Sequence, residues 1–360
     1  MGKKILYIMH VDWRWIKQRP HFIAEGLSDS YDVTVAHFYS KKYLFGNSEG
    51  LTTNEKNLNL LSAFRLPLYQ EKIIYDLNKA YMKIYFRFLI KKYDPYFIWI
   101  TFPQLYDYIP SDTSCKIIYD CMDEATGFNF NDDFKLKILE SEKKLVEDAS
   151  IIFTSSNYLF KNLDEKYKCK NKLMLIRNAF GGDIIDDDAK KERGKTYKIG
   201  YVGTISKWID FEKINASLEK IDNIEYHLIG PCELENELKH DKVKFYGTIP
   251  YNELYNYVKD FDCLIAPFIV DNKIKSADPG KLYGYINYNK PIISVYYKEL
   301  DYFSKFINFY SNTHEYLNLL IDMVKNGFNR KYSNCERYEF LKNNSWDTRV
   351  SEIIKHLKTL

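Results

Sequence analysis

Short apolar runs alternate with longer amphipathic segments along the first half of the chain. Runs rich in Ile, Val, Phe and Tyr predict buried strands, and the 3.6-residue spacing of apolar positions between them predicts helices. The predicted strands are Lys4 to His10, Tyr31 to Phe38, Phe97 to Phe102, Lys116 to Cys121 and Ser150 to Ser156, and the predicted helices are Gln18 to Leu27, Glu71 to Lys92 and Asp133 to Asp148.

The alternation stops at a polar segment, Gly181 to Thr196, which opens with Gly-Gly and is typical of a linker. It then restarts, and the tail from Trp346 to Leu360 predicts a final amphipathic helix. The strands predicted after the linker are Lys198 to Gly203, Ile224 to Gly230, Val243 to Gly247, Cys263 to Phe268 and Pro291 to Val295, with a helix at Tyr251 to Lys259.

This order predicts an α/β protein of two tandem doubly wound, Rossmann-like domains, because continuous buried strands separated by helices form parallel sheets. We place the domains at residues 1–182 and 195–342, with a C-terminal helix in 343–360 that packs back on the first domain. Ligands of such domains bind beyond the carboxyl ends of the strands, so we expect the functional site in a central cleft.

Composition narrows the class. The chain has 360 residues, 46% of them hydrophobic and 28% charged, with a formal net charge of +3, which predicts a soluble globular protein and gives no argument for nucleic-acid binding. Six cysteines form no CxxC pair, which favours reduced thiols in a cytoplasm over a zinc site or a disulfide framework. No stretch approaches the roughly 20 apolar residues of a membrane span.

Two segments of the second domain suggest an anion site. Gly203 and Thr204 begin the turn after a strand, where backbone amides can approach an anion, and Lys207 could add a direct contact. Lys281 falls in the first turn of a helix that runs to about Asn287, where a cation opposes the helix dipole unless an anion shares the site. An ordinary turn and a solvated lysine remain the alternatives.

In the first domain, Asp120, Asp123 and Glu124 lie at the end of a predicted strand. Carboxylates at such a position can act as a general base or bind sugar hydroxyls, and they could equally cap the next helix.

The order of motifs resembles the GT-B glycosyltransferases, particularly the bacterial branch in glycosyltransferase families 4 and 1 that builds capsular, teichuronic-type and other surface polysaccharides. The resemblance covers nearly the whole chain. The matching segments are "WIKQRP" (Trp15 to Pro20), "YDCMDE" (Tyr119 to Glu124), "LIRNAF" (Leu175 to Phe180), "IGYVGTI" (Ile199 to Ile205), Val243 to Phe268 and "DPGKLYGYINYNKPII" (Asp278 to Ile293).

The resemblance implies a role for each matching residue. Gly203 and Thr204 would meet the diphosphate of a nucleotide sugar, and Lys281, helped by Lys207, would neutralise it as the leaving group. Asp120 or Asp123 would face the acceptor and the reacting sugar. The nucleotide base would lie against Tyr246, Gly247 and Ile249, and Asn178 would lie near a hinge.

The sequence departs from the family pattern at two positions. Many relatives carry two glutamates about eight residues apart, the second of which holds the ribose, and here these positions are Ser276 and Gly284. Either another group, such as Asp278 or Tyr283, would then take over the donor contact, or the donor would bind in a different position.

The loop "DWRWIKQRP" (Asp12 to Pro20) would contact the acceptor, because aromatic faces pack on sugars and arginine binds acidic groups in bidentate fashion. Pro20 suits the first helical position, which leaves Arg19 outside the helix. We expect acceptor contacts from Asp12, Trp13, Trp15 and Arg19; plain packing of the two tryptophans is the alternative.

The expected activity is metal-independent transfer of a glycosyl group from a nucleotide diphosphate sugar, with UDP as the expected nucleotide, to a saccharide or lipid-linked saccharide. No cofactor, metal or nucleic-acid partner is expected. The alternatives are a non-catalytic nucleotide-sugar-binding partner of a transferase complex, an epimerase and a phosphorylase of the same fold.

The segment Tyr81 to Tyr93 mixes Lys83, Arg87, Lys91 and Lys92 with apolar residues. Such a helix could rest on an anionic membrane at its inner face, or it could be a core helix.

Overall fold

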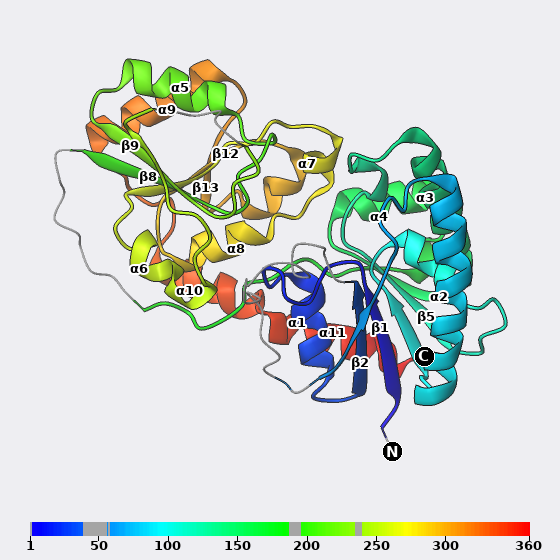
Figure 1. The fold of residues 1–360 in the computed structure, drawn as a ribbon. Coiled ribbons are helices and arrows are strands. Elements are labelled where there is room, and N and C mark those ends of the chain that lie inside the picture. The colour runs from blue at the N-terminus through cyan, green and yellow to red at the C-terminus, as the bar shows by residue number, and fades with distance from the viewer. Residues whose placement is uncertain (1, 39–55, 57, 187–195, 235–239) are drawn as a thin grey trace. The chain divides into compact units, whose positions relative to one another are not determined.

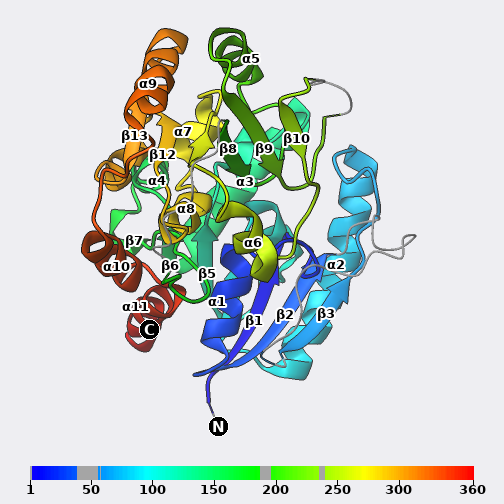
Figure 2. The same ribbon diagram turned by 90° about the vertical axis from the view of Figure 1, so that its left-hand side faces the viewer.

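Two parallel sheets organise the chain, each in its own unit (Figures 1 and 2). The computed structural model describes residues 2–38, 56, 58–186, 196–234 and 240–360. Unit 1 comprises Met1–Ala179, Ser276–Asp278 and Trp346–Leu360, and unit 2 comprises Phe180–Lys275 and Pro279–Ser345. The first segment therefore ends at Ala179, before the predicted linker, of which residues 187–195 lie outside the described residues. The expected cleft concerns the mutual placement of the units and stays a prediction.

The sheet of unit 1 has the strand order β3-β2-β1-β4-β5-β6-β7, with all neighbours parallel. The predicted strands are confirmed, and two edge strands were missed because they are only five and three residues long. The strands are β1 (Lys4–Met9), β2 (Asp32–Phe38), β3 (Asn59–Ala63), β4 (Phe97–Ile100), β5 (Lys116–Cys121), β6 (Ala149–Thr154) and β7 (Leu173–Leu175), the missed ones being β3 and β7.

Helices cover both faces of this sheet. On one face α1 (Arg19–Leu27) packs with α11 (Trp346–Lys358), and the ring of Phe22 stacks on Trp346 at 5.1 Å between centroids. The tail helix thus belongs to unit 1. The other face is covered by α2 (Lys72–Tyr93), α3 (Asp132–Asp148) and α4 (Asn157–Tyr167), and short 3₁₀ turns connect the elements at Pro103–Tyr108, Ala125–Gly127 and Lys170–Lys172.

Unit 2 repeats the same strand order over six parallel strands, β10-β9-β8-β11-β12-β13. Helices α5 and α9 pack together, and α8 packs with α10 on the opposite side of the sheet (Figure 1). The elements are β8 (Tyr197–Val202), β9 (Ile224–Ile229), β10 (Val243–Phe245), β11 (Cys263–Ala266), β12 (Ile292–Val295), β13 (Ile307–Tyr310), α5 (Phe211–Lys220), α6 (Leu254–Val258), α7 (Asn272–Ser276), α8 (Gly280–Asn287), α9 (Thr313–Asn326) and α10 (Asn334–Asn343), with 3₁₀ turns at Tyr251–Glu253 and Lys298–Phe303. The predicted fold class is confirmed.

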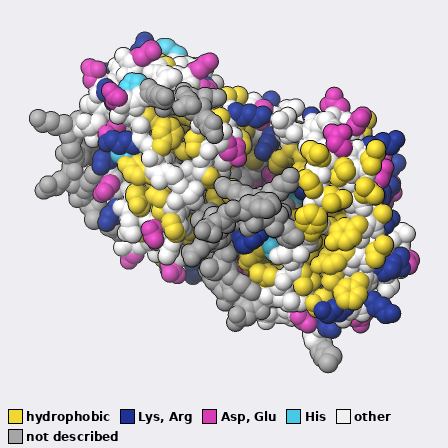
Figure 3. Space-filling view, in the orientation of Figure 1, with side chains coloured by type: hydrophobic (Ala, Val, Ile, Leu, Met, Phe, Trp, Pro, Cys, Tyr) yellow, Lys and Arg dark blue, Asp and Glu magenta, His cyan; other side chains and the backbone are white. Residues whose placement is uncertain are grey.

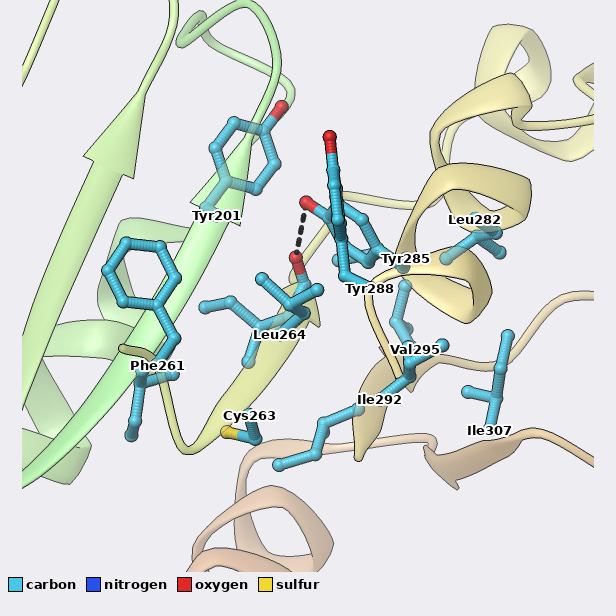
Figure 4. Packing of buried hydrophobic residues seen from close by; sticks show 14 of the residues in the cluster. Tyr201, Phe261, Cys263, Leu264, Leu282, Tyr285, Tyr288, Ile292, Val295 and Ile307 are labelled. Carbon is cyan, nitrogen blue, oxygen red and sulfur yellow. Dashed lines mark hydrogen bonds between the residues drawn. The ribbon is translucent and has the colours of Figure 1, made fainter. Parts of the chain in front are cut away.

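A buried tyrosine fixes helix α8 to the sheet of unit 2. The Tyr285 hydroxyl accepts a hydrogen bond from the backbone amide of Val202 at the end of β8, at 2.8 Å, and lies 3.3 Å from the carbonyl of Ile265 in β11 (Figure 4). Because residues four apart share a face of a helix, Tyr285 also orients Lys281 toward the carboxyl ends of these two strands.

Because β8 is closely packed, we expect a side chain at Gly200 to destabilise the protein. A Cβ added there would lie 2.1 Å from the buried ring of Phe261, so we expect Gly200→Ala to lower the free energy of unfolding by about 1–3 kcal/mol. Gly284 in α8 is the matched control, because nothing lies within 4 Å of its added Cβ and alanine favours the helix, so Gly284→Ala should not destabilise the protein. Urea unfolding of both variants tests this, and equal midpoints would contradict it.

Candidate anion site at the carboxyl edge of unit 2

The strongest candidate site lies where the strand order of unit 2 reverses, between β8 and β11. The Lys281 ammonium donates a hydrogen bond to the Tyr201 hydroxyl at 2.7 Å, and that hydroxyl donates to the carbonyl of Thr204 at 2.9 Å. The ammonium also lies 4.4 Å from the centre of the Tyr201 ring and 4.9 Å from that of Phe268. Doubly wound sheets bind ligands at this point of reversal.

Gly203 is required at the turn for two reasons. Its φ of +143° is a conformation that side chains rarely adopt, and an added Cβ would lie 2.6 Å from Lys281 Nζ. The Gly203 amide already donates to the Ile229 carbonyl at 2.8 Å, so the prediction that this amide meets a diphosphate does not fit. In the part of the chain that the structure describes, the Thr204 amide has no such partner, and it remains a donor for a ligand.

Two further glycines bring a second loop to this turn. Gly230 has a φ of +141°, and an added Cβ would lie 2.1 Å from the carbonyl oxygen of Gly203. Its amide donates to the carbonyl of Gly247, which has a φ of +69°. Gly247 follows the exposed Tyr246 in the loop that was predicted to bind the nucleotide base. The hydrogen bond from Gly230 therefore links this loop to the strand end that packs on the Gly203 turn.

The Lys281 ammonium lacks a compensating charge. Among the described residues it forms no ion pair, and its burial lowers the pKa from 10.5 to about 7. A partly buried cation that faces a turn with an open amide is a site where an anion would restore the charged form.

The remaining predicted donor residues divide into exposed and buried ones. Lys207 and Tyr246 are exposed and Ile249 is partly buried, with the Tyr246 hydroxyl 2.6 Å from Nδ1 of His227. Tyr283 does not fit a donor contact, because its ring is fully buried against Phe303 and Phe340.

Asp278 does not fit a donor contact either, because it is buried within unit 1. Its carboxylate accepts hydrogen bonds from Arg177 Nη1 at 3.3 Å and from the backbone amide of Asn178 at 2.7 Å. Of the two positions where the resemblance led us to expect glutamate, Ser276 is buried and its carbonyl accepts a hydrogen bond from Ser156, whereas Gly284 faces open space.

In unit 1, Arg19 and Asp120 form a buried ion pair with each other. Arg19 Nη2 and Nε donate to the Asp120 carboxylate at 2.7 and 3.0 Å, and Nη1 donates to the carbonyl of Ile176 at 2.7 Å. Arg19 is the first residue of α1, not a loop residue, and it is 3% exposed, while Asp120 is fully buried. The predicted acceptor contact of Arg19 and catalytic role of Asp120 are therefore corrected to a structural pair.

Two of the other predicted acceptor residues, Asp12 and Trp13, are also buried. Trp13 is buried in the core against the ring of His21, as the packing alternative proposed, and Asp12 is buried in an ion pair with Arg14 at 3.0 Å. Trp15 and the predicted catalytic Asp123 are only partly buried.

His10 was missed by sequence reasoning. It follows β1 directly, its backbone amide donates to Thr101 Oγ1 at 3.2 Å and its Nδ1 lies 2.9 Å from the same oxygen. Burial, together with the charge of Arg65, lowers the pKa of His10 to about 4, so the imidazole is neutral at pH 7. The sequence did contain a signal that could have identified it: His10 is a polar residue at the carboxyl end of a buried parallel strand, β1, where the strand order of the sheet reverses.

A metal centre is not evident. No group of three or more His, Cys, Asp or Glu side chains that could hold a metal ion occurs among the residues that the structure describes.

Solved structures of glycosyltransferases share this architecture. Sucrose-phosphate synthase from Thermosynechococcus elongatus is similar over 99% of this chain and 98% of its own, with a TM-score of 0.76 and 12% identity. HepE of Anabaena, solved in complex with UDP and glucose, matches over 100% of both chains with a TM-score of 0.68 and 13% identity. The fold is GT-B, and the resemblance inferred from the motifs is confirmed.

One protein that is similar in sequence has a name that indicates a more specific role. TuaH of Bacillus subtilis, a protein named for glycosyl transfer in teichuronic acid biosynthesis, is 24% identical over 216 residues. The match spans 54% of this chain and 54% of TuaH, so about half of the relative's length is covered. No family model matches the chain.

Removal of one member of the buried pair tests its structural role. Arg19→Met leaves the Asp120 carboxylate buried without its partner, and we expect the free energy of unfolding to fall by about 3–5 kcal/mol. Arg87→Met is the control, because Arg87 and its partner Asp112 are both exposed and the change should leave the free energy of unfolding nearly unchanged. A stable Arg19→Met protein that had lost only acceptor affinity would restore the acceptor role.

The lowered pKa of Lys281 predicts a pH-dependent stability cost. The unfolded chain holds this proton up to about pH 10.5 and the folded chain only up to about pH 7, so the cost is full below pH 7 and declines as pH rises toward 10.5. We expect Lys281→Met to raise the Tm of the ligand-free protein by several degrees at pH 6.5, with a smaller gain at pH 9.5. Lys207→Met, at an exposed lysine, should leave Tm unchanged. A constant gain across this range would contradict the expected titration.

Proposed function

We propose that this protein is a glycosyltransferase that moves a sugar from a nucleotide diphosphate sugar, with UDP as the expected nucleotide, to a saccharide or lipid-linked saccharide. The observation that carries the proposal is the Lys281 ammonium beside Gly203, without a counterion among the described residues and tethered by Tyr201.

Bond cleavage explains why this geometry suits the reaction. When the bond from the anomeric carbon to the diphosphate breaks, negative charge develops on the departing phosphate oxygens. An ammonium and a backbone amide that are already in place stabilise this charge without reorganisation. One charge-assisted hydrogen bond contributes roughly 1.5–3 kcal/mol, or one to two powers of ten in rate when it acts mainly in the transition state.

The comparisons support the donor class. HepE was solved with UDP-glucose as well as with UDP and glucose, and trehalose-6-phosphate synthase from E. coli was solved with UDP-2-fluoro glucose. TuaH and the lipopolysaccharide galactosyltransferase WaaB, by their names, act in surface polysaccharide assembly. We extend both features to this chain: a UDP-linked donor and a role in cell-surface polysaccharide synthesis, such as that of a capsule.

For the acceptor we propose the carboxyl edge of unit 1. Trp15 and Asp123 are partly buried there, and His10 offers a neutral imidazole at the strand-order reversal. Asp123 is the carboxylate we retain for contact with the reacting sugar. Because Lys281 supplies the positive charge that a metal ion would otherwise provide at the diphosphate, we propose that the reaction needs no metal and no cofactor. We also propose that it takes place in the cytoplasm, at the inner face of the membrane.

Loss of the Lys281 charge tests the proposal. Lys281→Ala should lower the rate of sugar transfer at least tenfold, because the leaving diphosphate loses its charged donor, while the fold persists. The measurement is release of nucleoside diphosphate from a panel of UDP-sugars by the purified full chain, with and without EDTA. Lys220→Ala, an exposed lysine on α5, is the control.

The outcomes separate the alternatives. Unchanged turnover in Lys281→Ala would remove the lysine from the mechanism, and a complete loss in EDTA that Mg²⁺ or Mn²⁺ restores would refute metal independence. A thermal shift with nucleotide sugar but no transfer or hydrolysis would identify a non-catalytic partner, which the absence of glutamate at Ser276 and Gly284 favours.

A further inference from the structure

Helix α2 of unit 1 carries two apolar faces, and only one of them is covered. The covered face packs on the sheet through Tyr75, Met82, Phe86 and Leu89. The other apolar positions follow the helical spacing i, i+4, i+8, i+11, i+15 and are exposed to solvent: Ile73 by 76%, Leu77 by 52%, Tyr81 by 45%, Ile84 by 73% and Phe88 by 59%. We name these five residues the α2 stripe. The core-helix alternative therefore leaves these five exposed apolar residues unexplained.

The α2 stripe forms one continuous surface. Hydrophobic side chains gather over α2 in the space-filling view, with basic side chains at the margin (Figure 3). Fifteen residues separate Ile73 from Phe88, so the stripe is about 22 Å long. An apolar surface that is continuous and bordered by polar side chains is typical of a site of association.

The charges beside the stripe identify the partner. Within α2, Asp76 is the only carboxylate among six basic residues, although the net charge of the whole chain is only +3. Two of the six already have acidic partners outside the helix: Arg87 pairs with Asp112 at 2.6 Å and Lys79 with Asp107 at 3.4 Å. The basic residues are Lys72, Lys79, Lys83, Arg87, Lys91 and Lys92. An apolar stripe with a positively charged margin is the pattern of a helix that lies in the interface of an anionic bilayer.

From these observations we infer that the α2 stripe docks unit 1 on an anionic lipid bilayer, with the stripe among the acyl chains and the flanking lysines at the lipid phosphates. The stems of lysine and arginine lie along the apolar surface while their charged ends reach the headgroups. No helix among the described residues is long and apolar enough to cross a membrane, so the contact lies in the plane of the surface.

A second copy of this chain fits the same surface poorly. Two α2 helices packed face to face would bring together two copies of Lys72, Lys83, Lys91 and Lys92, for which the described residues supply no carboxylate partner. One stripe about 22 Å long and about 10 Å wide also falls well below the roughly 800 Å² per partner of a stable protein interface. A bilayer needs no complementary side chains and supplies the missing negative charge.

Vesicle flotation with the purified full chain tests the inference without any sugar chemistry, so its outcome is independent of the proposed function. We expect binding to vesicles that contain 30 mol% phosphatidylglycerol in phosphatidylcholine, much weaker binding to pure phosphatidylcholine, and a loss of binding as salt is raised.

Matched variants assign the binding to α2. Ile84→Ser with Phe88→Ser should lower the partition coefficient at least tenfold, whereas the control pair Ile269→Ser with Tyr338→Ser, also exposed but in unit 2, should leave it unchanged. Lys91→Gln with Lys92→Gln should lower binding to anionic vesicles about tenfold, compared with no more than twofold for Lys220→Gln with Lys325→Gln. The melting temperature of each variant should equal that of the wild type, because all eight side chains are exposed.

Three results would overturn the inference. The first is absence of wild-type binding to anionic vesicles. The second is an equal loss of binding in the stripe variants and in their controls. The third is a lipid-free dimer, detected by sedimentation velocity, that Ile84→Ser with Phe88→Ser dissociates while vesicle binding is unaffected; this result would assign the stripe to a second copy.

Discussion

The candidate chemistry depends on one electrostatic constraint: the Lys281 ammonium is partly buried against the Gly203 turn without an opposing charge among the described residues. Tyr201 holds the ammonium by a neutral hydrogen bond, and Tyr285, one turn further along α8, holds the helix on the ends of β8 and β11. Burial without a counterion costs stability, and an anionic ligand would recover that cost as binding free energy. The positive-φ glycine is necessary because any side chain at position 203 would occupy the space of the ammonium.

The same topological rule produces a candidate site in each unit. In both sheets the order of strands reverses after the first strand, between β1 and β4 in unit 1 and between β8 and β11 in unit 2. The loops that leave the two central strands diverge at this point and leave room for polar groups. In unit 2 the residue directly after the central strand is Gly203, and in unit 1 it is His10, held by Thr101 from the end of β4.

Burial in unit 1 reverses two simple expectations about polarity. The segment from Asp12 to Arg19 is rich in charge, yet Arg19, the first residue of α1, lies in the interior, because Asp120, the Ile176 carbonyl and Asn178 together satisfy its guanidinium. Helix α2 is rich in apolar residues, yet Ile73, Ile84 and Phe88 lie in solvent, because the sheet covers only one face of the helix. Residue type alone therefore does not separate core from surface in this unit. Whether a side chain is buried in this unit depends on which groups pack against it in the folded structure.

Local pattern was enough to predict the α/β class, the strands at the centre of both sheets and the position of Lys281 in the first turn of α8, because periodicity and turn residues act over a few neighbouring positions. It was not enough for the edge strands β3, β7 and β13, which are only five, three and four residues long. The fate of individual side chains depended on contacts between distant residues, such as Lys281 with Tyr201, 80 positions apart, and Arg19 with Asp120, 101 positions apart. Such contacts turned the predicted acceptor residues Arg19 and Trp13 into core residues and brought Lys281 to the glycine turn, because hydrogen-bond partners and burial are set by packing across the sheet and not by neighbours in sequence.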